Sequence, residues 1–150
     1  KFTGVHRRFE VLGEVNGITV ADDFAHHPTE LTAVLNASME MGFNKVWAVF
    51  QPHTFSRTFM LLDDFAKALS IPDEVIVSEI LPVRETNTYN IYAEDLCAKI
   101  DGSVYRKTFD EITEYVCANA KSGDLILTMG GGNVYMCANQ IYAKLQAMNK

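Results

Sequence analysis

Short apolar, β-branched runs alternate with stretches of helical periodicity along almost the whole chain. Residues 46–50, Val-Trp-Ala-Val-Phe, form a continuous apolar run of the kind that is buried on both faces of a sheet. Further strands are predicted at 74–80, 103–106 and 124–129, and helices at 28–41, 61–69, 93–100, 109–120 and 134–148. Strands separated by helices in this way imply right-handed crossovers and a mostly parallel sheet.

The start of the chain carries a different pattern. Residues 9–15 alternate apolar and polar side chains, Asn16-Gly17 is a hairpin turn signal, and residues 18–24 form the matching partner. We therefore expect one α/β domain over residues 1–150, with a Rossmann-like, doubly wound fold. Its mostly parallel sheet should hold about six strands, with one antiparallel edge strand from the N-terminal hairpin.

Composition narrows the class of protein. The 150 residues suffice for one domain with a sizeable core, and the net charge of −6 argues against non-specific nucleic-acid binding. No apolar run approaches the ~20 residues of a membrane helix, and the first residues lack the apolar region of a signal peptide. We expect a cytoplasmic protein with no nucleic-acid or membrane partner, whose three cysteines (Cys97, Cys117 and Cys137) are small buried hydrophobes.

Two polar motifs follow predicted strands. Residues 22–30 read Asp-Asp-Phe-Ala-His-His-Pro-Thr-Glu, and residues 51–58 read Gln-Pro-His-Thr-Phe-Ser-Arg-Thr. Both would project from the carboxyl edge of the sheet, where open α/β sheets bind ligands. The two motifs therefore predict a polar site at this edge, although each alone could be no more than a capped strand-to-helix turn.

The side chains of these motifs suggest different tasks. Asp22 and Asp23 are adjacent and point to opposite faces of a strand, so one should hold the turn while the other reaches the edge. His53 offers a proton acceptor near neutral pH, and Arg57 offers a planar fork for a carboxylate or phosphate. Ser56 is positioned to cap the following helix.

Three other features are less specific. The glycines at 130–132 favour a tight turn over an anion cradle, because neither a Walker A sequence nor G-x-G-x-x-G is present. Arg7 and Arg8 form either a solvated basic turn or a phosphate contact. His26 and His27 are adjacent, and no H-x-H or H-x-x-x-H pattern occurs, so we expect no metal site.

Taken together, the motifs resemble those of the C-terminal domain of the Mur ligases. The resemblance runs from Phe2 to the last helix, and its other stretches are Gly-Val-His-Arg-Arg-Phe at 4–9 and Gly-Asp-Leu-Ile-Leu at 123–127. The Gln-Pro-His…Ser-Arg-Thr motif and the Glu at the end of residues 22–30 favour the alanine-adding members over the murein-peptide ligases.

The resemblance implies an ATP-dependent amide ligation in peptidoglycan synthesis. In this family ATP phosphorylates the lactyl carboxylate of UDP-N-acetylmuramate, and the amine of L-alanine attacks the acyl phosphate. ATP and Mg²⁺ would act in the full-length enzyme, with none held tightly by this domain alone. The family's UDP-binding and central ATPase domains are absent from residues 1–150, which contain no G-x-x-x-x-G-K-[ST], so this chain should be inactive alone.

The family's functional residues carry over by position. The resemblance implies that Arg8 and His26 are catalytic, that Arg8 reaches the ATP phosphates and that Asp23 reaches the ribose. It also implies that the substrate-binding end of the site is formed by Phe24, His26, His53 and Arg57. At this end Arg57 would bind the carboxylate of L-alanine. The sequence departs from the family twice, with Phe24 where Tyr is common and Thr54 where Arg is common.

Other interpretations remain open. The domain could belong to a murein-peptide ligase, or it could be a free-standing nucleotide- or phosphate-binding regulatory module. A metal phosphoesterase built on the histidines is a third possibility.

Overall fold

In the computed structural model, which describes residues 8–149, the chain enters its sheet through a tight hairpin. The strands β1 (Glu10–Val15) and β2 (Ile18–Asp23) pair antiparallel. The two turn residues, Asn16 and Gly17, have positive φ angles of 54° and 81°. A two-residue turn of this kind matches the twist of the flanking strands, which confirms the predicted hairpin.

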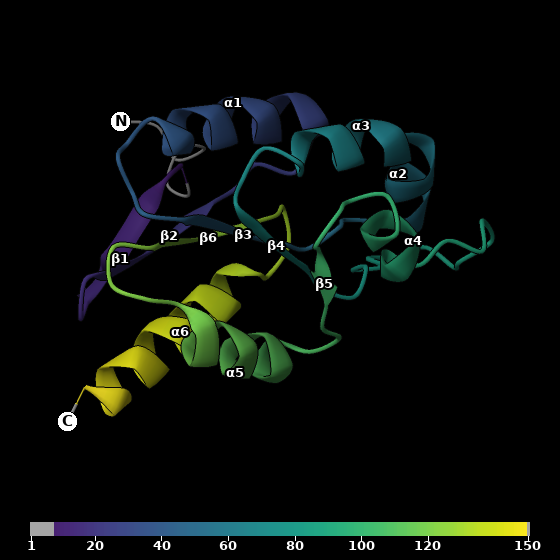
Figure 1. Ribbon diagram of the computed structural model, residues 1–150. Coiled ribbons are helices and arrows are strands. Elements are labelled where there is room, and N and C mark those ends of the chain that lie inside the picture. The colour runs from purple at the N-terminus through teal and green to yellow at the C-terminus, as the bar shows by residue number, and fades with distance from the viewer. Residues whose placement is uncertain (1–7, 150) are drawn as a thin grey trace, which may run out of the picture.

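The sheet has six strands in the order β1-β2-β6-β3-β4-β5 (Figure 1). The four later strands are β3 (Val46–Phe50), β4 (Glu74–Val77), β5 (Val104–Tyr105) and β6 (Leu125–Met129). All four run parallel to β2, and only β1 is antiparallel. The predicted fold class is therefore confirmed, and β6, the last strand in the sequence, lies between β2 and β3.

Helices cover both faces of the sheet. In Figure 1, α1 (Pro28–Met39), α2 (Phe55–Met60) and α3 (Leu62–Ala68) lie above it, while α5 (Phe109–Asn119) and α6 (Tyr135–Met148) lie below. The short α4 (Ala93–Cys97) lies beside β5. Among the helices of residues 8–149, none is long and apolar enough to cross a bilayer.

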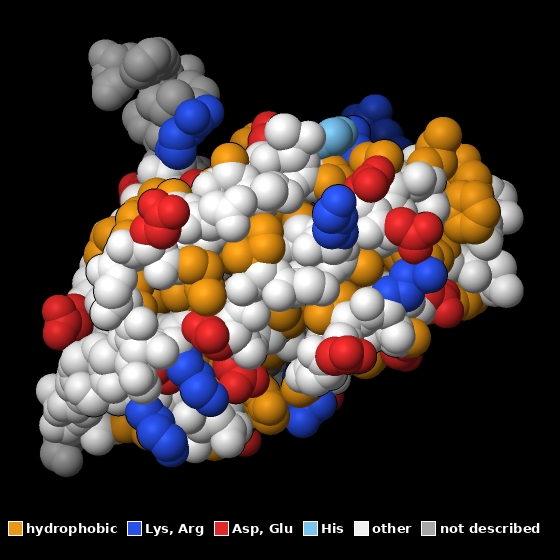
Figure 2. All heavy atoms as spheres, turned by 45° about the horizontal axis from the view of Figure 1, so that its top comes forward, with side chains coloured by type: hydrophobic (Ala, Val, Ile, Leu, Met, Phe, Trp, Pro, Cys, Tyr) orange, Lys and Arg blue, Asp and Glu red, His pale blue; other side chains and the backbone are white. Residues whose placement is uncertain are grey.

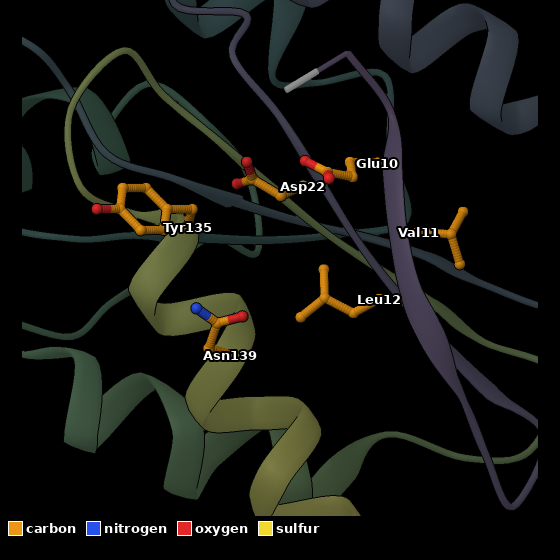
Figure 3. Close-up of a pocket in the computed structure, with 6 residues that line it drawn as sticks. All are labelled: Glu10, Val11, Leu12, Asp22, Tyr135 and Asn139. Atoms are coloured by element: carbon orange, nitrogen blue, oxygen red, sulfur yellow. The ribbon is translucent and has the colours of Figure 1, made fainter. Parts of the chain in front are cut away.

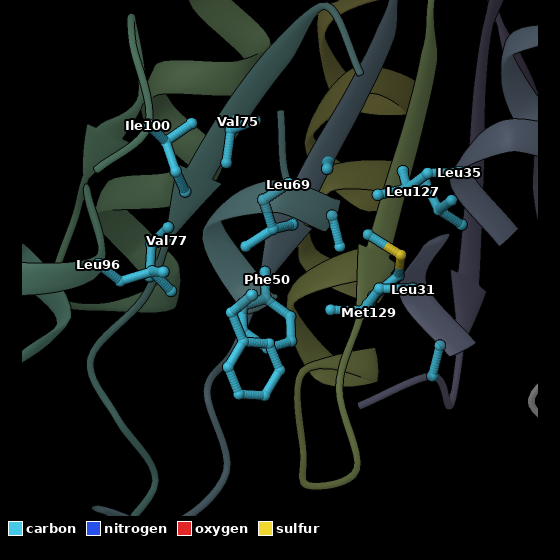
Figure 4. Packing of buried hydrophobic residues seen from close by; sticks show 14 of the residues in the cluster. Leu31, Leu35, Phe50, Leu69, Val75, Val77, Leu96, Ile100, Leu127 and Met129 are labelled. Atoms are coloured by element: carbon cyan, nitrogen blue, oxygen red, sulfur yellow. The ribbon is translucent and has the colours of Figure 1, made fainter. Parts of the chain in front are cut away.

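The central strand β3 shows how the two layers are held. Val46, Ala48 and Phe50 belong to the apolar cluster under α1 and α3, part of which is drawn in Figure 4. Trp47 and Val49 belong to a second cluster against α5 and α6. Alternate side chains of a strand point to opposite faces, so a continuous apolar run is buried from both sides, as predicted.

The three cysteines belong to these packed layers. Cys117 and Cys137 are buried, Cys97 is half-buried, and all three are free thiols. Burial raises the pKa of Cys137 to about 12, which disfavours the reactive thiolate. The expectation of small buried hydrophobes holds for Cys117 and Cys137.

Several elements are shorter than predicted, and two differences lie next to the second motif. The strand expected at 74–80 ends at Val77, because its neighbour β5 pairs only with Ile76 and Val77 and the chain then turns towards the loop after β3. The helix α2 begins at Phe55, before the apolar pattern predicted at 61–69, so only the cap predicted at Ser56 indicated a helix here. Its apolar residues Phe59 and Met60 are exposed, so they produce no periodic pattern of burial.

Candidate functional site

The carboxyl ends of β2, β6 and β3 lie next to one another at one edge of the sheet. The loops after β2 and β3 lead to helices on one face, whereas the loop after β6 leads to α6 on the other, which is the arrangement at which open α/β sheets bind ligands. The rings of His26 and His53, one from each motif, have centroids 6.0 Å apart. The prediction that the two motifs meet at one edge is confirmed.

Asp23 holds the loop after β2. Its carboxylate accepts hydrogen bonds from the backbone N–H of Phe9 at 2.7 Å and of Ala25 at 2.8 Å, and the residue is 4% exposed. Burial raises the pKa of this carboxyl, while the two amides and Arg8 oppose that rise. Asp23 is therefore the aspartate that fixes the turn.

Asp22 points to the opposite side of β2 from Asp23. Its Oδ1 accepts a hydrogen bond of 2.6 Å from Thr128 Oγ1, and its side chain lines a pocket of about 320 Å³ with Glu10, Tyr135 and Asn139 (Figure 3). That pocket lies between β1 and α6. The prediction that the two aspartates have different tasks is confirmed, because Asp23 holds the turn while strand alternation directs Asp22 towards α6.

A second pocket adjoins the β2 loop. It has a volume of about 200 Å³ and is lined by Arg8, Asp23 and Phe24, with Glu30, Ala33 and Val34 of α1. Arg8 is exposed and close enough to Asp23 to lower its pKa. Residues 4–7 of the Gly-Val-His-Arg-Arg-Phe motif, Arg7 among them, lie outside the described residues.

His26 and His27 have different environments. His27 is the N-cap of α1, with Pro28 in the first turn as predicted, and Glu30 Oε1 accepts from the backbone N–H of His26 at 3.1 Å and of His27 at 3.3 Å. His26 Nδ1 lies 2.9 Å from the carbonyl oxygen of Phe24. A carbonyl can only accept, so Nδ1 carries the proton and Nε2 is the acceptor of the neutral ring. Capping of α1 thus explains why a histidine stands at position 27, but it gives no reason for the one at position 26.

The loop after β3 contains two buried polar atoms with no hydrogen-bond partner among residues 8–149, Gln51 Oε1 and His53 Nδ1. The other end of the Gln51 amide donates to Asn133 Oδ1 at 2.8 Å. Burial lowers the pKa of His53, as do His26 and Arg57, and Glu85 opposes them. His53 is therefore neutral at pH 7, and buried polar atoms without partners are uncommon enough to mark a place where a ligand binds.

Thr54 connects this loop to α2 through a strained backbone. Its φ of 69° and ψ of 149° belong to a region that is otherwise populated almost only by glycine. Its Oγ1 accepts a hydrogen bond of 3.2 Å from the backbone N–H of Arg57, so Thr54, and not Ser56 as predicted, caps this helix. Ser56 instead contacts Glu85, which lies in a loop where no functional residue was predicted.

The glycine turn after β6 packs directly against both motifs. A Cβ on Gly131 would lie 3.0 Å from the ring of His26, and one on Gly132 would lie 2.3 Å from Leu81 and 2.8 Å from Gln51 Oε1. None of residues 130–132 has a positive φ. Glycine is required here for close approach, and not for a left-handed turn.

Metal ligation receives no support from the donor set. In the part of the chain that the structure describes, no three His, Cys, Asp or Glu side chains gather closely enough to hold an ion.

Comparison with known proteins identifies the family. Residues 7–132, well over half of the chain, match the family model described as "Mur ligase, glutamate ligase domain". The chain belongs to this family. This Mur ligase domain is 47% identical over 138 residues to the UDP-N-acetylmuramate–L-alanine ligase of Lachnospira eligens, a match that covers 89% of the chain and 30% of that protein. The domain thus spans about three-tenths of the length of the curated relatives it matches.

Solved structures agree on the fold. The UDP-N-acetylmuramate-alanine ligase of Thermotoga maritima matches with a TM-score of 0.75 and 24% identity, over 95% of this chain and 30% of that one. A murein peptide ligase of Psychrobacter arcticus matches with a TM-score of 0.77 and 27% identity, over 96% and 31%. The two scores are nearly equal, so the fold of this Mur ligase domain does not by itself separate the two activities.

Proposed function

We propose that this Mur ligase domain is the C-terminal part of an ATP-dependent ligase that joins L-alanine to UDP-N-acetylmuramate in peptidoglycan precursor synthesis. The observation that carries the proposal is the 47% identity to the Lachnospira eligens ligase, which bears that name. Such a ligase would act in the cytoplasm, where its nucleotide substrates are made.

The proposed reaction has two steps. The lactyl carboxylate takes the γ-phosphoryl group of ATP, which gives an acyl phosphate and ADP. The amine of L-alanine then attacks the acyl carbon, and an amide forms as phosphate leaves and the nitrogen loses a proton. The sequence contains no P-loop, so the UDP-binding and ATPase parts, and the groups that hold Mg²⁺, would belong to the rest of the longer protein.

The β2 loop would form the nucleotide end of the site. Arg8 and Asp23 line the same pocket of about 200 Å³, where a cation can meet the ATP phosphates. Each carboxylate oxygen of Asp23 accepts one backbone N–H and has a further lone pair. Asp23 can therefore also accept a hydrogen bond from a ribose hydroxyl.

The β3 loop and His26 would form the amino-acid end. The guanidinium of Arg57 would bind the alanine carboxylate with two parallel hydrogen bonds, and Thr54 supplies no second cation. His26, whose ring packs edge-on against Phe24 at 5.0 Å, would accept the amine proton at Nε2. His53 is neutral, so it would contact the substrate without repelling its ammonium group.

A ligation assay with the full-length protein tests this proposal. ADP release should require both UDP-N-acetylmuramate and L-alanine, and a murein tripeptide should not replace L-alanine. If the tripeptide is the better substrate, the protein is a murein-peptide ligase. If neither supports ADP release, the proposed function is wrong.

The isolated 150-residue chain provides a second test. It should fold but release no ADP, and it should bind ATP only at about millimolar concentration or above, because few contacts offset the free energy of association. Calorimetry measures this affinity. Micromolar ATP binding by the isolated chain would favour a free-standing regulatory module.

A further inference from the structure

Glu85 connects a loop to the first turn of α2. Its Oε1 accepts a hydrogen bond of 2.9 Å from the backbone N–H of Ser56, and its Oε2 accepts one from the Ser56 hydroxyl. The neighbouring N–H, that of Arg57, is capped by Thr54. The first N–H groups of a helix have no partner within the helix, so Glu85 and Thr54 together satisfy those that flank the Arg57 side chain.

The loop that carries Glu85, residues 82–91, is anchored to the β3 loop. Thr54 N donates to the carbonyl of Leu81 at 2.8 Å, and Leu81 N donates to the carbonyl of Pro52 at 2.9 Å. These bonds place the start of the 82–91 loop beside His53 and Thr54. The backbone of Thr54 is strained, and strain of this kind persists only where the surrounding contacts over-determine it.

The charge of Glu85 also reaches the site. Hydrogen bonds from Ser56 hold the pKa of Glu85 below its ordinary value, and the charge of Arg57 acts in the same direction. Among residues 8–149, the charged and titratable groups that act on His53 are His26, Arg57 and Glu85, and of these Glu85 alone raises its pKa. Glu85 is thus the negative charge that partly balances the positive charge of Arg57 beside this imidazole.

We propose that Glu85 is a positioning residue for the amino-acid end of the site, holding the first turn of α2 so that Arg57 can bind the substrate carboxylate. The inference rests on the proposed function for the identity of that substrate. Loss of the Glu85 carboxylate leaves the Ser56 N–H without its acceptor and allows Thr54 to relax. Arg57 then loses its fixed position while its charge remains.

A second contact between the same two segments supplies a control. One turn further along α2, Phe59 stacks on Tyr89 of the 82–91 loop, with ring centroids 5.2 Å apart. Both rings are substantially exposed. Figure 2 shows apolar side chains gathered at the right-hand end of the view, the end at which Figure 1 places α2. Tyr89→Ala loosens this apolar contact and leaves the carboxylate in place.

Steady-state kinetics of the full-length ligase test the proposal. Glu85→Ala should raise the KM for the amino acid by about tenfold to a hundredfold, as expected for misplacement of a binding group, with kcat and the KM for ATP nearly unchanged. Glu85→Gln keeps one acceptor oxygen and should restore part of the affinity, whereas Tyr89→Ala should have little effect. An unchanged KM in Glu85→Ala, or an equal rise in Tyr89→Ala, would overturn the proposal.

Titration of His53 in the 150-residue chain, followed by NMR, tests Glu85 without any assumption about the substrate. Glu85→Gln should move the His53 midpoint to lower pH, because the one charge that raises its pKa is removed. Glu79→Gln removes an exposed carboxylate that pairs with Lys107 and should leave the midpoint in place. If the midpoint does not move in Glu85→Gln, Glu85 does not act on this site, whether or not the full-length protein is an alanine ligase.

Discussion

The loops after β2 and β3 meet at one edge of the sheet but are built in opposite ways. In the β2 loop both oxygens of Asp23 are paired, and Glu30 forms a capping box with His27 at the start of the helix that follows. In the β3 loop Gln51 Oε1 and His53 Nδ1 are buried without partners in the described chain, and Thr54 is strained. The first loop contributes to the stability of the fold. In the second loop, the unpaired polar atoms and the strained backbone destabilise the free domain, and binding of a ligand would explain why they are present.

The largest effect should follow from a change just after the β3 loop. In the full-length ligase, Arg57→Lys should lower kcat/KM for L-alanine, because Lys cannot form two parallel hydrogen bonds with a carboxylate. The ratio of the two kcat/KM values should correspond to a loss of about 2–4 kcal/mol in transition-state stabilisation. The loss should appear as a raised KM for L-alanine, measured by ADP release, with a far smaller change in the KM for ATP.

Arg84→Lys is the matched control for this change. Arg84 is exposed on the 82–91 loop, so its replacement should leave both KM values in place. If Arg57→Lys instead weakens ATP binding and spares L-alanine, the assignment of the β3 loop to the amino acid is wrong.

In the β2 loop a comparable change should affect stability. Asp23→Asn turns an amide NH₂ towards one of the two backbone N–H groups, which loses its acceptor at a cost of about 1–3 kcal/mol. Urea unfolding of the 150-residue chain measures the free energy of unfolding. Asp101→Asn, at an exposed turn, should have almost no effect. Equal stability of Asp23→Asn and wild type would remove the contrast between the loops.

In the β3 loop, the substitution Thr54→Gly should raise the free energy of unfolding. Relief of a strain of about 1–3 kcal/mol is opposed by the entropy that glycine loses on folding, about 0.5–1 kcal/mol, and by the lost cap on the Arg57 N–H, roughly 0.3 kcal/mol. The domain should therefore gain about 1 kcal/mol. Ala37→Gly, at an exposed position within α1, should instead cost about 1 kcal/mol in the same urea experiment. A destabilised Thr54→Gly variant would mean that the β3 loop is not strained.

The smallest effect concerns pH. The pKa of His53 is lowered in the folded chain, mainly by burial, so below its ordinary value of 6.5 the unfolded state binds more protons. This contribution to stability is complete above pH 6.5 and is lost as the pH falls through the folded pKa. His53→Gln should therefore lose less stability than wild type between pH 7.5 and pH 5, measured by urea unfolding. An identical loss of stability in both proteins would mean that folding does not lower the pKa of His53.

Much of the fold could be predicted because its patterns are local. The buried run of β3, the hairpin at Asn16 and Gly17, and Pro28 in the first turn of α1 each depend on residues that are neighbours in the sequence. Strand ends were less predictable. The end of β4 is set by the two-residue strand β5, whose pairing partners are distant in the chain.

The site could be predicted only in outline. The sequence places His26 and His53 at one edge because both follow strands, and the structure brings them together. The roles of Asp22, Thr54 and Glu85 depend on contacts that no local pattern encodes. Glu85 and Ser56, for example, are 29 residues apart and lie in segments with no regular periodicity.

The central place of β6 has a consequence for how this protein is made. Leu125 pairs with both Thr19 of β2 and Val46 of β3, so β2 and β3 do not touch each other. As the chain leaves the ribosome, these two strands must wait, with unpaired edges exposed, until residues 125–129 have been synthesised. Such edges readily pair with other chains. The edge of the sheet that carries both motifs is therefore assembled only after residues 125–129 have left the ribosome.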